Sequence, residues 1–390
     1  MTHNPSIVLT EDLLARCRAR AANHDRDNTF FNEDLAELSE AGYLRMAVPR
    51  KLGGLGLPME LAHAETRRLA RYAPATALAL NMHVYWTGMA ADLRRAGDRS
   101  LEWLLEEAIQ GEIFAAGHGE IGNDLPVLMS TSRAEPVPGG YRVSGHKIFG
   151  SLAPVWTRLG VHALDASDPQ NPRIVHLFVP RDSAGLTVKR TWDTLGMRAT
   201  QSDDTVMEDV FVPEHYVSRH VPPGEMDAFV LGIFAWGLLG FASVYLGIAE
   251  RAMELTVAGL HRKRALGVSR SLAYHPHAQH TVARMSLALE AMIPHWEKTL
   301  RDWSQEVDHG PRWPALIAAT KHHCVTGCWE VVDQAMDLSG GGGMFRGNEM
   351  ERLFRDARCG RFHPANSALA HEIIGKTALG IDMGEQPRWG

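Results

Sequence analysis

The sequence is poor in cysteine and has no strongly basic segment. Its 390 residues include four cysteines, too few for a disulfide framework in a chain of this size, so we expect a reducing, cytoplasmic setting. The formal net charge is −6 and the longest basic run is 261–264, which gives nucleic-acid and anionic-membrane binding little electrostatic support. Residues 1–12 lack a basic segment followed by an apolar core, which predicts no signal peptide.

Charged residues are absent from 229–249, a stretch long enough to span a bilayer. The acids Asp227 and Glu250 flank it, rather than Lys or Arg anchors on both sides. A helix that is apolar all round can also form the centre of a helical bundle. We therefore predict a buried core helix here and no membrane association.

The sequence also lacks a recognisable metal or dinucleotide motif. The histidine-rich segments 275–280 and 322–328 do not have zinc-ligand spacing, so we predict no metal site. Residues 117–122 match G-x-G-x-x-G, but no helix-like segment follows, which argues against a dinucleotide-binding turn. A glycine-rich loop that closely approaches a flat ligand remains open there. The glycines at 340–343 indicate either a wide turn between helices or a cofactor contact.

Hydrophobic periodicity divides the chain into three parts. Leucines at helical spacings run through the first part, and short runs separated by Pro, Gly and Asp follow from 113 to about 221. The helical period then returns and holds to about 379. This order predicts an α+β protein with a small antiparallel β-domain between two helical domains.

Several motifs in this order resemble the acyl-CoA dehydrogenase superfamily. V-S-G-H-K-I-F-G-S occupies 143–151, and L-G-M-R-A-T at 195–200 leads into a strand that ends V-P. S-G-G-G-G-M-F-R-G occupies 339–347, and R-D-A-R occupies 355–358. The resemblance covers nearly the whole chain. It implies an N-terminal α-helical domain at 1–111, a middle β-domain at 112–222 and a C-terminal four-helix-bundle domain at 223–390.

The resemblance implies FAD as the cofactor, with FMN as an alternative in a monooxygenase. Phe149 would pack on the flavin ring next to Gly150, and Ser151 would give a hydrogen bond to flavin N5. The remaining implied cofactor contacts are Lys263, Arg264, Asp337, Gly340 and Gly341. Because a neighbouring subunit completes the family's flavin site, the resemblance also implies a homotetramer.

The glutamate that serves the family's dehydrogenases as catalytic base is missing. Its position after R-D-A-R falls on Pro364, and the base position that other members use on the first long C-terminal helix falls near Gly237. A proton acidified only by a thioester needs a positioned base, so we propose His363 or Glu372 as a replacement. The alternative for His363 is a helix-stop residue that bonds a backbone carbonyl.

Three functions remain open. The first is FAD-dependent oxidation of the CH–CH bond of an acyl thioester or related carbonyl compound, with an electron-transfer partner, and we favour it slightly. The second is monooxygenation with reduced flavin and O₂, supplied by a flavin reductase, because K-I-F-G-S at 147–151 and the His363-Pro364 pair resemble that branch of the superfamily. The third is a catalytically silent flavin-binding subunit, which the missing glutamate suggests.

Overall fold

A computed structural model describes residues 8–382 and 385, so part of the N-terminal segment for which we predicted no signal peptide lies outside the described residues. The N-terminal part is helical, as predicted. Its helices are α1 (Glu11–Asp27), α2 (Asn32–Glu40), α3 (Met59–Ala70), α4 (Pro74–Arg95) and α5 (Glu102–Gln110). The side chain of Thr10 accepts a hydrogen bond from the backbone N–H of Leu13 and caps α1, satisfying one of the free donors of its first turn.

The middle part is one sheet of eight strands in the order β6-β7-β3-β2-β4-β5-β8, with β1 paired to β4. The strands are β1 (Phe114–Gly117), β2 (Arg133–Val137), β3 (Gly140–Gly150), β4 (Arg158–Asp165), β5 (Arg173–Pro180), β6 (Leu186–Lys189), β7 (Asp203–Pro213) and β8 (Val217–Val221). Most pairs are antiparallel, but β1 runs parallel to β4, with Gly117 opposite Val161. This register matters because it brings His118, which follows β1, beside His162 of β4.

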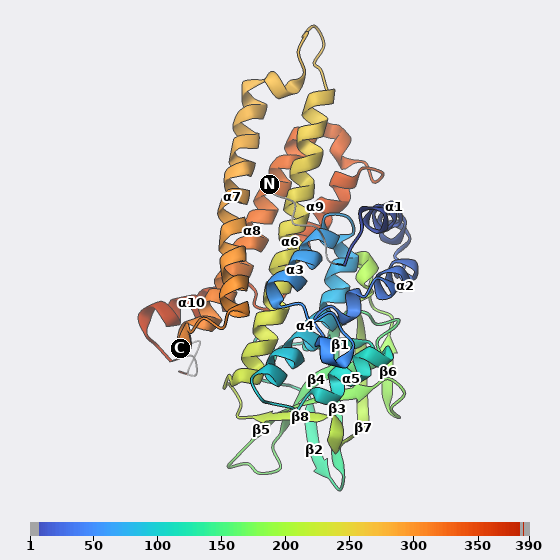
Figure 1. The fold of residues 1–390 in the computed structure, drawn as a ribbon, viewed down its shortest axis with the longest axis vertical. Helices are drawn as coiled ribbons and strands as arrows, with labels where there is room; N and C mark the ends of the chain where they lie inside the picture. The colour runs from blue at the N-terminus through green and yellow to red at the C-terminus, as the bar shows by residue number, and fades with distance from the viewer. Residues whose placement is uncertain (1–7, 383–384, 386–390) are drawn as a thin grey trace.

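The C-terminal part is a bundle of long helices that extends away from the sheet (Figure 1). It contains α6 (Ala228–Arg262), α7 (Pro276–Ser304), α8 (Trp313–Ser339), α9 (Glu349–Cys359) and α10 (Ser367–Leu379). Asp227 and Asn366 cap α6 and α10 through their side-chain oxygens. The predicted arrangement of helical, sheet and helical domains is thereby confirmed.

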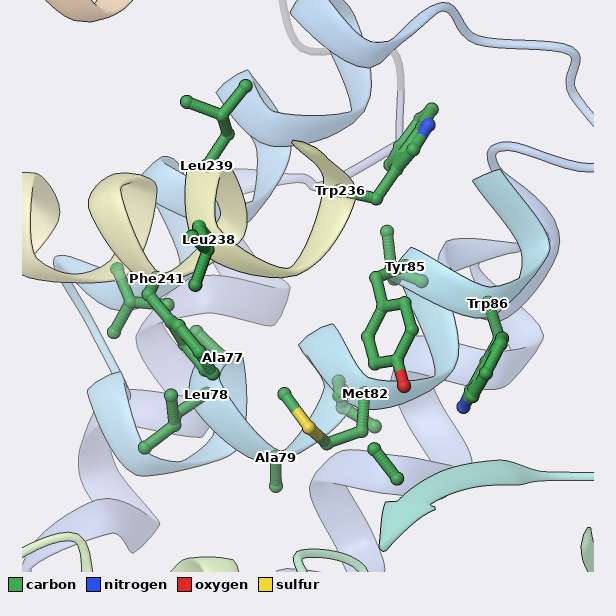
Figure 2. Packing of buried hydrophobic residues seen from close by; sticks show 14 of the residues in the cluster. Ala77, Leu78, Ala79, Met82, Tyr85, Trp86, Trp236, Leu238, Leu239 and Phe241 are labelled. Carbon is green, nitrogen blue, oxygen red and sulfur yellow. The ribbon is translucent and has the colours of Figure 1, made fainter. Parts of the chain in front are cut away.

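Helix α6 is the central element of the molecule. It is long and apolar enough to cross a membrane, yet 94% of its most apolar window is buried within the protein, which confirms the predicted core helix. Close packing against α4 depends on Gly88, where an added Cβ would lie 2.4 Å from the ring of Trp236. Figure 2 shows Phe241 of α6 and Leu78 and Met82 of α4 among the side chains between the two helices.

Candidate active site

A cavity of about 530 Å³ opens where the three parts of the chain meet. Tyr85 of α4, Ser151 after β3, Gly237 of α6 and His363 after α9 are among the residues that line it. Most of the other lining side chains are apolar, and no Asp, Glu, Lys or Arg occurs among the described residues of the wall. A ligand group inside this cavity therefore meets apolar surface and a few neutral hydrogen-bonding groups.

The segment after β3 is held in an unusual backbone conformation. The pairing of β3 with β7 is irregular between Lys147 and Gly150, and both Phe149 and Leu152 have positive φ, at 60° and 67°. Positive φ is costly for side chains of this size and often marks functional segments. Here it leaves the Phe149 ring 57% exposed at the cavity, with its edge on Trp192 at a centroid distance of 6.0 Å.

A buried ion pair anchors this segment from behind. Lys147 Nζ lies 2.5 Å from Glu120 Oε1 and donates to the carbonyl oxygen of His162 at 2.6 Å. Burial raises the pKa of the Glu120 carboxyl, but Lys147 and several N–H and O–H donors outweigh it and bring the pKa to about 2. Burial lowers the pKa of Lys147 to about 8, with Glu120 opposing that shift. The pair is charged at neutral pH and fixes the position of β3 directly before Phe149 and Ser151.

Three hydroxyl groups form a hydrogen-bonded chain in the cavity wall. Ser151 Oγ lies 2.8 Å from Ser202 Oγ, which lies 2.7 Å from Thr200 Oγ1. Thr200 Oγ1 donates to the carbonyl oxygen of Met197 at 2.8 Å. All three hydroxyl side chains belong to the cavity lining.

His363 stands on a different part of the wall and is held on two sides. Its Nε2 atom lies 2.8 Å from the hydroxyl oxygen of Tyr245, and its ring stacks on Phe241 at a centroid distance of 4.6 Å. Burial, with a smaller effect of Lys321, lowers the pKa of His363 to about 3, so the imidazole is neutral at ordinary pH. The Nδ1 atom has no hydrogen-bond partner among the described residues.

A buried lysine supports the same loop. Lys321 Nζ donates to the carbonyl oxygens of His363 at 3.1 Å and Ala365 at 2.9 Å. No carboxylate pairs with it among the described residues, and burial lowers its pKa to about 7. Lys321 therefore positions the loop around Pro364 through its carbonyl groups.

A second polar group faces the cavity from α4 and the end of β1. The hydroxyl oxygen of Tyr85 lies 2.8 Å from His118 Nε2, and His118 Nδ1 lies 3.3 Å from His162 Nδ1. His162 Nε2 in turn lies 2.9 Å from the carbonyl oxygen of Met129. Tyr85 and His118 line the cavity, while His162 is fully buried behind them.

The structure brings together some of the predicted site residues. Phe149, Ser151 and His363 meet at the cavity, and so do Pro364 and Gly237, the two positions where the family's glutamate is missing. Gly150 lies in β3 directly beside them. Glu372 does not belong to the described cavity wall; it lies on α10 and pairs with Lys376 at 3.1 Å.

The other predicted cofactor contacts lie at the end of the bundle far from the sheet (Figure 1). There Lys263 Nζ donates to the carbonyl oxygen of Ser339 at 2.6 Å, and Gly340 has a φ of 65°. Arg264 and Asp337 flank this contact along the chain, and a Cβ added at Gly340 or Gly341 would meet no atom within 4 Å. Their role in binding the nucleotide of a neighbouring subunit stays a prediction. Within residues 8–382 and 385, no group of three potential ligands is arranged to hold a metal ion.

Sequence reasoning missed Tyr85, His162 and the two partners of Ser151 in the hydroxyl chain. His118 was noticed only as part of a glycine motif. The signal for His162 is the parallel register of β1 and β4, which runs from Phe114 opposite Arg158 to Gly117 opposite Val161. The next residue on each side is a histidine, and the two Nδ1 atoms lie 3.3 Å apart. No local pattern in the sequence predicts the register between these two strands.

Comparisons with known proteins agree with this architecture. Family models for the acyl-CoA dehydrogenase N-terminal, middle and C-terminal domains match residues 11–101, 115–210 and 239–368. The chain is 28% identical to L-evernosamine nitrososynthase of Micromonospora sp. over 96% of this chain and 90% of that protein. It is 25% identical to the putative acyl-CoA dehydrogenase YdbM of Bacillus subtilis over 90% of this chain and 91% of that protein.

A solved structure is similar over the same extent. KijD3, determined in complex with FMN and dTDP-3-amino-2,3,6-trideoxy-4-keto-3-methyl-D-glucose, superposes with a TM-score of 0.83 at 28% identity, over 96% of this chain and 94% of that one. Fold, cavity and motifs together define a flavin-dependent oxidoreductase, as predicted. The chain belongs to the acyl-CoA dehydrogenase family.

Proposed function

We propose that this protein is a flavin-dependent monooxygenase that oxygenates an uncharged amine. The observation that carries the proposal is the lack of any carboxylate among the described residues of the cavity wall. Proton abstraction next to a thioester requires a base, and both positions that supply it in the family hold residues without one, Pro364 and Gly237. An oxygen transfer to an amine nitrogen, which already has a lone pair, does not require such a base.

The residues around Ser151 fit a flavin ring. The exposed ring of Phe149 offers a flat apolar surface, and the hydroxyl chain offers a polar atom next to it. Gly119 keeps the neighbouring backbone close, since a Cβ there would lie 2.7 Å from the carbonyl oxygen of Ile148. Bound here in reduced form, a flavin supplies two electrons, so that one atom of O₂ enters the amine and the other leaves as water. FAD and FMN both remain candidates, and the similar KijD3 was solved with FMN.

The hydroxyl chain favours the reduced state of that flavin. Each of its three close oxygen–oxygen contacts needs a proton between the two atoms, and three hydroxyl groups supply three protons. Because the last acceptor is the Met197 carbonyl, Thr200 donates to it, Ser202 donates to Thr200 and Ser151 donates to Ser202. Ser151 then has only a lone pair for the cavity. It can accept from the N5–H of a reduced flavin but cannot donate to N5 of an oxidised one, contrary to the donor role that we inferred from the family.

His363 complements this arrangement as a donor. The Tyr245 hydroxyl has no other acceptor among the described residues, so it donates to His363 Nε2, and the imidazole proton lies on Nδ1. A neutral N–H group stabilises negative charge that develops on a nearby oxygen atom. In this assignment His363 is an electrostatic group of the oxygen-transfer step rather than a base.

The relatives support an amine as the substrate, since the similar proteins include L-evernosamine nitrososynthase and an amino sugar nitrososynthase. Acyl-thioester oxidation, our first expectation, is the alternative, and the similar YdbM is named a putative acyl-CoA dehydrogenase. A monooxygenase of this kind needs a flavin reductase, and a dehydrogenase needs an electron-transfer partner. We retain the homotetramer and the cytoplasmic location as proposals.

The test is incorporation of labelled oxygen. The protein is supplied with reduced FMN or FAD by a flavin reductase under ¹⁸O₂ and offered a panel of neutral amines, including amino sugars. We expect an N-oxygenated product that carries ¹⁸O and depends on the protein. A parallel assay offers acyl-CoA thioesters with an artificial electron acceptor. Enoyl product there, together with no labelled product from any amine, would overturn the proposal.

A further inference from the structure

Tyr85 is the one phenol on the described cavity wall, and the mechanism above does not use it. Its side chain is 2% exposed, and its hydroxyl group meets His118 at the wall itself. Behind His118 the hydrogen-bonded chain continues to His162 and ends at the carbonyl oxygen of Met129. The direction of the protons in this chain decides what Tyr85 offers to a ligand.

A backbone carbonyl only accepts hydrogen bonds, so the 2.9 Å contact with Met129 places the proton of His162 on Nε2. The backbone N–H of Val127 also points at Nε2, at 3.3 Å, and would donate to it only in the other tautomer; we infer the proton position from the shorter contact, in which Nε2 faces the Met129 carbonyl oxygen. A neutral imidazole carries one proton, so His162 Nδ1 accepts from His118 Nδ1. His118 Nε2 must then accept from the hydroxyl group of Tyr85.

The geometry points to Tyr85 as the residue that selects the substrate: its oxygen is locked as a hydrogen-bond acceptor, so the cavity takes a ligand with an uncharged N–H or O–H donor. Within the proposed function, on which this inference rests for its chemistry, that donor is the N–H of the amine to be oxygenated. Ser151 and Tyr85 thus both accept, one from the cofactor and one from the substrate, while His363 donates.

Two further observations restrict Tyr85 to recognition. Burial raises the pKa of its hydroxyl well above 10, so the phenol stays neutral, and burial lowers the pKa of His118 to about 3. The chain ends at a carbonyl, which offers a proton no path to solvent. A cationic ligand would meet no opposite charge, because no carboxylate lines the described cavity wall. The selected group is therefore a neutral donor, such as a free amine.

The test is binding, measured by calorimetry at pH 8 on the purified flavin-loaded protein without turnover. Aniline and toluene have the same shape, and only aniline carries an N–H donor. We expect Tyr85→Phe to raise the dissociation constant of aniline about fivefold relative to that of toluene, the usual effect of losing one neutral hydrogen bond. If the ratio of the dissociation constants of aniline and toluene is the same in Tyr85→Phe as in the wild type, the inference is overturned.

A second variant tests the direction of the hydrogen bond between the Tyr85 hydroxyl group and His118. His118→Leu removes the acceptor of the Tyr85 proton, so the freed hydroxyl can donate, and we expect benzaldehyde, an acceptor ligand, to bind about fivefold more tightly than to the wild type. If His118→Leu binds benzaldehyde no more tightly than the wild type, the Tyr85 hydroxyl group does not donate to His118 in the wild type. Because neither measurement requires oxygenation, selective aniline binding without labelled product would refute the proposed reaction and leave this inference standing.

Discussion

The Nε2 atom of His363 lies 2.8 Å from the hydroxyl oxygen of Tyr245, while the imidazole ring stacks on Phe241. Two elements far apart in the sequence, α6 and the loop after α9, thereby fix both the orientation and the tautomer of one histidine. A buried hydroxyl that donates to Nε2 leaves Nδ1 as the protonated atom.

His363→Ala should lower turnover of the best amine substrate by about 10²- to 10³-fold, the range found when one hydrogen-bond donor to a developing negative charge is lost. Flavin affinity should stay within about twofold of the wild type, because the flavin contacts come from the β3 side of the cavity. Steady-state kinetics measures the turnover, and flavin titration measures the flavin affinity separately. Near-normal turnover would return His363 to the role of a helix-stop residue.

Tyr245→Phe keeps the packing of α6 but removes the donor to His363. We expect kcat to fall by about five- to tenfold with KM unchanged, since one neutral hydrogen bond contributes roughly 1 kcal/mol. Steady-state kinetics on the same amine measures both parameters. An increase of KM alone would instead assign the pair to substrate binding.

The buried Lys321 should make stability depend on pH. Its pKa is lowered to about 7 in the folded protein from 10.5, so between these values the unfolded chain binds more protons than the folded one. The free energy of unfolding should therefore rise as pH increases from 7 to about 10, and the effect of Lys321 should be constant below pH 7. Lys321→Met is the matched control.

Urea denaturation at pH 6.5, 8 and 9.5 measures this effect. We expect the difference in stability between Lys321→Met and the wild type to shrink as pH rises, because the cost of burying the charge disappears in the wild type. A difference that is the same at all three pH values would mean that Lys321 is not forced toward neutrality by its burial.

Two glycines of α6 should respond in opposite directions to alanine. A Cβ at Gly237 meets no atom within 4 Å because this residue faces the cavity, whereas a Cβ at Gly247 would lie 2.4 Å from the carbonyl oxygen of Arg67. We expect Gly237→Ala to stabilise the protein by up to about 1 kcal/mol through helix propensity. Gly247→Ala should destabilise it by about 1–3 kcal/mol through overpacking. Thermal denaturation of the two variants tests the contrast, and equal shifts would contradict it.

Much of the fold follows from the sequence because it rests on ordered motifs and long periodic segments. The change from helical to strand patterns near Ile113 and the uncharged run that becomes α6 both have direct physical signatures. Phe149 and Ser151 lie in a motif, and His363 stands out as an imidazole next to the missing glutamate. These positions can be predicted from the sequence without their contacts.

The rest of the site depends on pairing between distant strands and helices. His118 and His162 meet only because β1 and β4 run parallel in one register, and Tyr85 lies in an apolar helix where a single hydroxyl leaves no periodic signal. The direction of hydrogen bonds at Ser151 required all members of its chain. Single-residue analogy with the family predicts the opposite direction from the one that we propose, because the Met197 carbonyl, which accepts from Thr200, is not visible in the motif.

The most direct test compares the dissociation constants of reduced and oxidised flavin, measured anaerobically with FMN and with FAD. We expect the wild type to bind the reduced form at least about fivefold more tightly, because Ser151 can only accept. Ser151→Ala should lose this preference, and Ser202→Ala, which frees the Ser151 proton, should bind oxidised flavin more tightly than the wild type. Tighter binding of oxidised flavin by the wild type, with a ratio that Ser151→Ala leaves unchanged, would contradict a site built for reduced flavin.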